Sequence, residues 1–100
     1  MVINKNGVYN PIFYTYYYRM THQEIIEYNE EALTCDGFDE AIIGMAERID
    51  LGPVVAYSVS KIIDILITRD NMSFEEAHEY FSFNIIQAWM GENTPIFIHT

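Results

Sequence analysis

The stretch PVVAYSVSKIIDILITR, residues 53–69, decides the fold that we expect for this chain. It opens with a short apolar run rich in valine, which predicts a buried strand over about 53–57. Ser58 or Ser60 then supplies a helix N-cap. Apolar side chains follow at the spacing of one helix face, which predicts a helix over about 59–69. The side chains expected to face the core are Val59, Ile62, Ile63 and Leu66.

Two further helices are expected to begin with a capping box, in which a hydroxyl side chain stands three residues before a glutamate. The motif at residues 21–24 begins a helix over about 22–33, and the motif at residues 73–76 begins a helix over about 74–90. The side chains expected to face the core are Ile25, Ile26, Ala32 and Leu33 in the first of these helices, and Phe74, Ala77, Phe81, Ile85 and Ala88 in the second.

A fourth helix is expected over about 38–48, because apolar residues recur there at the spacing of a helix face. Asp39 and Glu40 lie in its first turn, where acidic side chains suit the positive end of the helix dipole. The apolar stripe of this helix comprises Phe38, Ala41, Ile42, Met45 and Ile49.

Short strands are expected near both ends of the chain. Residues 12–18 are dense in tyrosine, phenylalanine and threonine, which favour strands. Residues 95–98 begin with a proline, which is tolerated at a strand start or on a sheet edge. Four helices packed with a few short strands predict an α+β fold, in a single domain over residues 1–100.

Acidic side chains outnumber basic ones by fifteen to five, and the net charge is −10. Residues 24–50 hold nine of the acids and only Arg48 among basic residues, whereas residues 1–23 hold no Asp or Glu. Such a field repels nucleic acid and anionic lipid, so we expect neither direct nucleic-acid binding nor membrane binding. It attracts a basic protein surface, although a face kept acidic for solubility has the same composition. The candidate partner-binding carboxylates are Glu24, Glu27, Glu30, Glu31, Asp39, Glu40 and Glu47.

The aromatic segment offers a second candidate surface. On a strand, alternate side chains face opposite sides, so Tyr14, Tyr16 and Tyr18 share one face. That face either forms an interface or is covered by a helix. Cys35 is the only cysteine, so no disulfide within the chain supplements the small core. Association of copies is the remaining route, and we expect a homo-oligomer.

Candidate catalytic and metal-binding groups are few. Glu75 and His78 have the spacing with which a carboxylate and an imidazole share a metal on a helix, but the chain has no second such pair, and a solvated first turn explains the spacing better. Cys35 precedes an expected helix start, yet the acids beside it oppose formation of a thiolate. His22 and His99 have no evident triad partner, and no glycine-rich phosphate loop is present. We therefore expect no catalytic, cofactor-binding or metal-binding residues, no cofactor and no enzymatic activity.

Six short segments occur in a distinctive order: DGFDEAIIG (36–44), PVVAY (53–57), MSFEEA (72–77), FNII (83–86), AW (88–89) and GENTP (91–95). In these segments the chain resembles a family of short, uncharacterised proteins of tailed bacteriophages. The resemblance covers about 36–98, while residues 1–35, with the aromatic strand and the acidic helix, are specific to this protein. Asn71 and Gln87 stand where we expect glycine in that family. The resemblance implies no activity; it implies a phage accessory protein that works in the cytoplasm of an infected bacterium.

Together these observations predict a small acidic accessory protein that binds a host or anti-phage defence protein with a basic surface and inhibits it. One version is a DNA mimic, whose carboxylates replace phosphates in a basic channel. The alternatives are an oligomeric structural or ligand-sequestering protein, assembled through the aromatic strand and Trp89, and a metal-dependent or hydrolytic enzyme built on Glu75, His78 and Cys35. We recognise no signal peptide and no apolar stretch of membrane-spanning length, so we expect a cytoplasmic protein.

Overall fold

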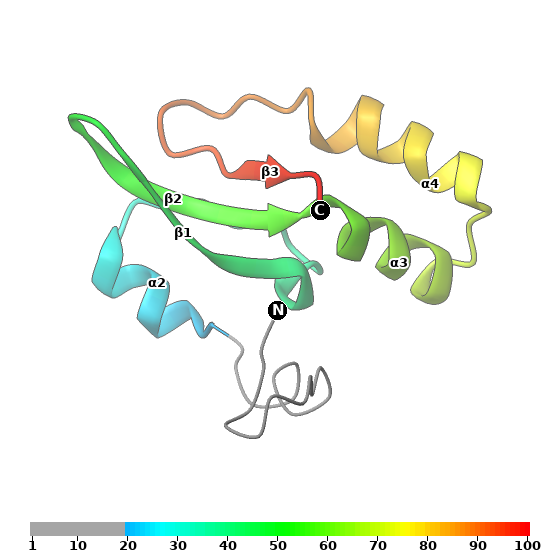
Figure 1. Ribbon diagram of the computed structural model, residues 1–100, viewed down its shortest axis with the longest axis horizontal. Helices are drawn as coiled ribbons and strands as arrows, with labels where there is room; N and C mark the ends of the chain where they lie inside the picture. Colours follow the sequence, from blue (N-terminus) through cyan, green and yellow to red (C-terminus); the bar gives the residue numbers. More distant parts are fainter. Residues whose placement is uncertain (1–19) are drawn as a thin grey trace, which may run out of the picture.

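The computed structural model describes residues 20–100, which form an α+β fold around a three-stranded sheet (Figure 1). The strands are β1 (Ile42–Arg48), β2 (Leu51–Ser58) and β3 (Ile96–Ile98), in the order β1-β2-β3. β2 pairs with β1 in antiparallel fashion and with β3 in parallel fashion. The predicted α+β class is therefore confirmed for the described part of the chain.

Three α-helices accompany the sheet in residues 20–100. They are α2 (His22–Tyr28), α3 (Val59–Arg69) and α4 (Phe74–Tyr80). A single 3-10 turn, η1 (Asp39–Ala41), precedes β1, and a π-helical turn, η2 (Phe81–Ile85), continues α4. The helices α3 and α4 form the crossover that a parallel pair of strands requires between β2 and β3.

The unit formed by β2 and α3 follows the sequence pattern closely. The helix α3 has the predicted bounds, and Ser58 is its N-cap, because the Ser58 hydroxyl accepts a hydrogen bond from the Lys61 backbone N–H at 3.3 Å. β2 begins at Leu51, two residues earlier than predicted, so Pro53 is its third residue and not its first. A proline is tolerated there because β3 pairs only with residues 56–58, so the missing N–H faces no strand on that side.

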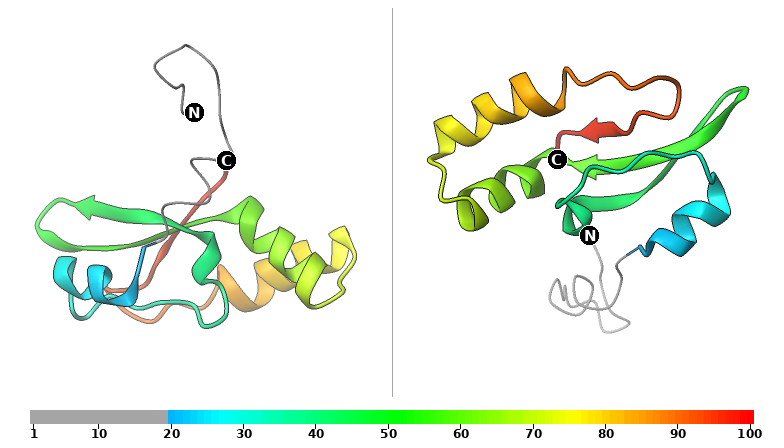
Figure 2. Two further views of the ribbon diagram at one scale, coloured as in Figure 1. Left: turned by 90° about the horizontal axis from the view of Figure 1, so that it is seen from below. Right: turned by 180° about the vertical axis from the view of Figure 1, so that it is seen from behind.

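The core lies where α2, α3 and η2 meet one face of the sheet (Figure 2). On that face the Tyr57 ring stacks on Phe97 with centroids 5.7 Å apart, and Phe81 meets Phe97 edge-on at 5.6 Å. Tyr57 has no exposed surface. The remaining buried members of this cluster are Met20, Ile25, Phe38, Ala41, Ile42, Val55, Val59, Ile62, Ile63, Leu66 and Ala77.

The predicted helix over 38–48 is wrong. Residues 42–48 form β1, and Ile49 and Asp50 make the turn to β2, with Asp50 in the left-handed region at a φ of 61°. Gly44 has a φ of 154° beside a register shift, a backbone conformation that favours glycine and that a helix does not provide. Ile49, expected in the core, is 90% exposed at the tip of the hairpin.

Two other predicted helices begin where expected and end early. The helix α2 has the predicted capping box but stops at Tyr28 rather than at residue 33, because Asn29 is extended and its side chain binds other segments. The helix α4 also has its capping box, but η2 ends at Ile85 rather than at residue 90. Ala77 and Phe81 are buried and Ile85 is partly buried, whereas Phe74 and Ala88, also expected in the core, are exposed.

Two strands are predicted at the ends of the chain. The strand predicted over 95–98 is confirmed as β3, one residue shorter. The strand predicted over 12–18, with Tyr14, Tyr16 and Tyr18, lies outside the described residues. Before α4, Asn71 has a φ of 56°, a region that asparagine tolerates better than most residues.

A pair of isoleucine substitutions distinguishes this fold from the helix expected over 38–48. We expect Ile62→Ala to lower the free energy of unfolding by about 2–5 kcal/mol, because it removes a fully buried side chain. Ile49→Ala should change it by less than about 0.5 kcal/mol, because Ile49 is at the hairpin tip. Urea denaturation followed by circular dichroism measures both values. A large loss for Ile49→Ala would favour the helix instead of the hairpin.

Candidate functional site

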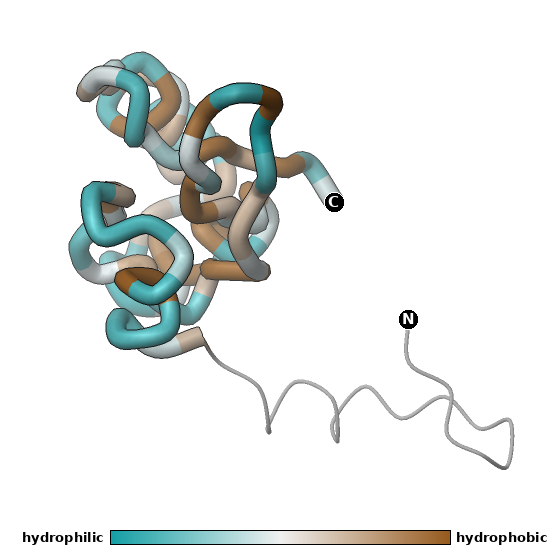
Figure 3. The backbone as a smooth tube through the Cα atoms, turned by 90° about the vertical axis from the view of Figure 1, so that its left-hand side faces the viewer, coloured by the Kyte–Doolittle hydropathy of each residue, from teal (hydrophilic) through white to brown (hydrophobic). Residues whose placement is uncertain are grey.

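The strongest candidate site is an acidic surface, by which we mean seven carboxylates carried by α2, the turn after it, η1 and β1. Figure 3 views the molecule from the side on which α2 lies in Figure 1, and many of the residues on this side are hydrophilic. Glu24 and Asp39 are half-buried, and the other five are exposed. The members are Glu24 and Glu27 on α2, Glu30 and Glu31 in the turn, Asp39 and Glu40 in η1, and Glu47 on β1.

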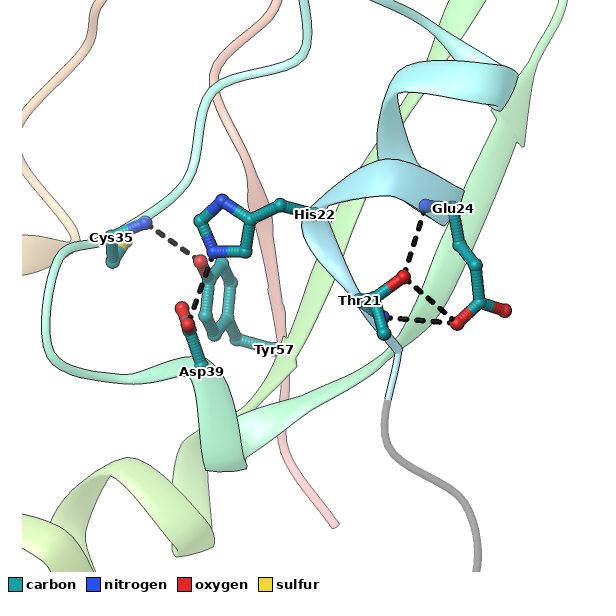
Figure 4. A network of polar contacts seen from close by, with 6 residues as sticks. All are labelled: Thr21, His22, Glu24, Cys35, Asp39 and Tyr57. Atoms are coloured by element: carbon teal, nitrogen blue, oxygen red, sulfur yellow. Dashed lines mark hydrogen bonds and ion pairs between the residues drawn. The ribbon is translucent and has the colours of Figure 1, made fainter.

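Two of the seven carboxylates, those of Asp39 and Glu24, accept hydrogen bonds from neighbouring residues (Figure 4). The Asp39 Oδ2 atom accepts a hydrogen bond from His22 Nε2 at 3.0 Å, which joins η1 to the start of α2. The Glu24 carboxylate accepts the Thr21 backbone N–H at 3.1 Å, while the Thr21 hydroxyl accepts the Glu24 N–H at 3.2 Å. The His22 contact with Asp39 links the start of α2, which carries Glu27, to η1, which carries Glu40, while the Thr21 and Glu24 contacts cap α2 itself.

Arg48 and Arg69 make their polar contacts with groups other than the exposed carboxylates of this surface. Arg48 donates to the Gly52 carbonyl from Nε at 2.9 Å and from one terminal nitrogen at 2.6 Å, and to the Glu92 carbonyl at 2.6 Å. Arg69 pairs with Asp70 at 2.9 Å and lies 5.0 Å from the centre of the Phe38 ring. Neither arginine forms an ion pair with the exposed carboxylates Glu27, Glu30, Glu31, Glu40 and Glu47.

An open groove borders the acidic surface between η1 and α3. Its volume is about 340 Å³, and one Arg69 terminal nitrogen donates to the Gly37 carbonyl at 2.6 Å within it. Gly37 has a φ of 85°, and a Cβ there would lie 2.9 Å from the same arginine nitrogen. Arg69 thus fastens the loop before η1 to the end of α3. The groove is lined by Gly37, Asp39, Glu40, Ile65, Thr68 and Arg69.

Cys35, Tyr57, His22 and Asp39 lie close together, which the sequence did not indicate (Figure 4). The Cys35 backbone N–H donates a hydrogen bond to the Tyr57 hydroxyl at 2.7 Å, and the His22 ring is hydrogen-bonded to the Asp39 carboxylate. Burial is the largest effect on the Cys35 thiol and raises its pKa; a hydrogen bond with Tyr57 lowers the pKa and Asp36 raises it. Burial also raises the pKa of Tyr57. This environment keeps the thiol protonated instead of activating it as a nucleophile.

The His78 ring of the Glu75 and His78 pair packs against its own helix. The His78 ring lies against Phe74, with centroids 4.3 Å apart, and Glu75 is exposed in the first turn of α4. Within residues 20–100, no three His, Cys, Asp or Glu side chains are grouped so that they could hold a metal ion.

Two further features were missed by sequence reasoning. Asn29 joins three segments, because its side-chain amide donates to the Pro53 carbonyl at 2.9 Å and to Asn93 Oδ1 at 3.1 Å, and its Oδ1 accepts the Glu31 N–H at 3.1 Å. The second feature is an exposed apolar segment after α4, which includes Phe83, Trp89 and Met90. The feature of the sequence that indicates this exposed apolar segment is the absence of charged residues from 81–91.

No family model, curated protein or solved structure matches this chain. The structural evidence for a function comes from the geometry of the described residues, 20–100. In that part of the chain, no helix combines the length and the apolar character needed to cross a membrane.

The reactivity of Cys35 with iodoacetamide across a pH series tests whether this cluster is chemically active. Because the folded protein raises the thiol pKa, we expect the midpoint of the alkylation rate to lie at higher pH than in the same protein unfolded in urea. Asp36→Asn should move the midpoint down, since the Asp36 carboxylate raises the thiol pKa. A midpoint below that of the unfolded chain would instead indicate an activated nucleophile.

Proposed function

We propose that this protein acts by binding another protein that has a basic surface, through the exposed carboxylates of the acidic surface. The observation that carries the proposal is that five exposed carboxylates, Glu27, Glu30, Glu31, Glu40 and Glu47, form no ion pair with Arg48 or Arg69, while the His22 contact with Asp39 joins two of the elements that carry them. A fixed arrangement of like charges attracts a complementary partner and repels competitors of the same sign.

The charges support fast and selective association more than tight binding. Each exposed ion pair is worth about 0.2–1 kcal/mol, so several must act together. Their combined field raises the association rate with a basic partner, and salt weakens it because charges separated by more than a Debye length are screened. Salt dependence is therefore the signature of this mode of binding.

The biological setting is proposed from the resemblance over about 36–98. We place the protein in the cytoplasm of an infected bacterium, as a phage accessory protein that inhibits a host or anti-phage defence protein. Support for inhibition comes from the chemistry of the surface, since a carboxylate array that occupies a basic surface denies it to other anionic ligands. Where that basic surface normally holds nucleic acid, the protein acts as a DNA mimic.

The experiment is affinity capture from bacterial lysate with the full chain and a charge-neutralised variant. The variant Glu27→Gln, Glu31→Gln, Glu40→Gln removes three exposed carboxylates and leaves Glu24 and Asp39, which have structural roles, in place. We expect a partner that is retained at about 50 mM salt, lost at about 500 mM salt, and bound roughly tenfold more weakly by the variant.

A matched control carries three neutralised carboxylates elsewhere: Asp64→Asn, Glu75→Gln, Glu92→Gln. These residues are exposed and lie outside both the acidic surface and an open groove beside Phe83, so this variant has the same net charge and should retain the partner. Equal loss in both variants would show that total charge rather than the acidic surface matters, and would refute the proposal. Elution of the partner by duplex DNA would identify mimicry.

A further inference from the structure

The largest unexplained feature is the apolar segment that follows α4. Phe83 is 70% exposed, Trp89 is 73% exposed and Met90 is 70% exposed, and Ile86 between them is 47% exposed. We call these four residues the apolar patch. Single exposed apolar side chains are ordinary, but four large ones within one short segment mark an interaction surface.

Local structure explains why this segment does not enter the core. In a continuous helix, Trp89 would follow Phe81 and Ile85 at four-residue intervals on the buried stripe. The π-helical turn η2 instead ends at Ile85, with the Ile86 N–H bonded to the Phe81 carbonyl at 2.9 Å. Phe81 is buried, whereas Phe83 and Trp89 face solvent. π-helical turns are often found at functional sites.

The patch is also free of charge. Residues 81–91 contain no Asp, Glu, Lys, Arg or His, in a chain whose net charge is −10. The nearest acids on α4, Glu76 and Glu79, share an open groove with Phe83 and so lie at the rim of the patch. In the view of Figure 1, the segment after α4 lies above β3, and α2 lies below β1 and β2.

We propose that the apolar patch is the contact surface between two copies of this chain. Two molecules of charge −10 repel each other, and this repulsion is weakest where their uncharged segments meet. A charged partner protein would find no complementary group in residues 81–91, whereas a second copy offers the same apolar side chains. A two-fold contact of this kind is self-complementary and closes on itself.

The surface available suits a small dimer. An aromatic side chain buries about 150–250 Å², so the four side chains offer roughly 500 Å² on each copy. A stable interface buries about 800 Å² on each partner, with an apolar core and a polar rim. The patch therefore supplies most of an interface core, and Tyr80 and the acids beside Phe83 are placed to form its rim.

Trp89 is the only tryptophan, so its fluorescence reports directly on the patch. We expect the full chain to sediment as a dimer at micromolar concentrations and to dissociate on dilution. The emission of Trp89 should shift to shorter wavelength as the dimer forms. Raising the salt concentration should strengthen the dimer, because it screens the repulsion between copies. This is the opposite of its expected effect on capture of a basic partner, so the two proposals fail independently.

The double variant Phe83→Ser, Met90→Ser keeps the reporter and removes two large side chains from the patch. We expect its dimer dissociation constant to rise about 100-fold or more, because large side chains at an interface centre dominate affinity. The matched control Ile49→Ser, Leu51→Ser removes two exposed apolar side chains at the hairpin tip and should leave the dissociation constant unchanged. Circular dichroism checks that both variants fold.

Three results would overturn the proposal. A monomer with exposed Trp89 at every concentration would show that the patch does not bind a second copy and would indicate a different protein as its partner. A monomer whose Trp89 emission is already shifted would mean that the chain covers its own patch. A dimer that survives the double variant unchanged would place the contact elsewhere.

Discussion

The burial of Tyr57 on the central strand is the constraint on which the other contacts depend. A fully buried tyrosine must find a hydrogen-bond partner for its hydroxyl, since an unsatisfied buried polar group costs about 1–3 kcal/mol. The Cys35 backbone N–H is that partner at 2.7 Å, so the loop after α2 must pass beside the hydroxyl. The ring itself stacks on Phe97, which lies on β3 beside β2. Because the loop is held at Cys35, η1 follows within reach of His22, and Asp39 accepts the His22 hydrogen bond.

The parts of the fold that the sequence predicted are those that local periodicity and capping specify. The helix α3 has its predicted bounds because Ser58 and the apolar spacing of Ile62 and Leu66 agree. Both capping boxes, at Thr21 and Ser73, are present as expected. Where the helices end could not be read from the same signals. Asn29 ends α2 because its amide binds Pro53 and Asn93, and no local pattern reveals partners so distant in sequence.

The error at residues 38–48 has a different cause, because the apolar spacing there fits two structures. Phe38, Ala41 and Ile42 are buried in the structure, as they were expected to be in a helix. Phe38 and Ala41 lie before β1, and Ile42 is its first residue, so their burial does not distinguish the helix from the hairpin. Two residues of the hairpin have a backbone conformation with positive φ that a helix does not provide. Gly44 in β1 has a φ of 154°, and Asp50 in the turn has a φ of 61°. A glycine in the middle of an expected helix costs about 1 kcal/mol relative to alanine, and this was the local conflict in the prediction. The carboxylates of the site could be identified from the sequence, but the contact between His22 and Asp39 could be identified only from the structure.

The distribution of charge gives a different character to two segments of the chain, residues 24–50 and residues 81–91. Residues 24–50 carry nine acids against Arg48, and that arginine is occupied with the Gly52 and Glu92 carbonyls. Two copies meeting through these carboxylates would bring like charges together without compensation, so this surface suits only a partner of opposite sign. The segment 81–91 has a different character, since it contains no charged residue and its nearest acids on α4, Glu76 and Glu79, lie at the rim of the patch. A dimer formed there would leave both acidic surfaces exposed on one particle. Two identical surfaces on one particle bind a multivalent basic target more tightly than either alone, provided that the geometry allows both to engage. Self-association and partner binding would then reinforce each other without sharing a residue.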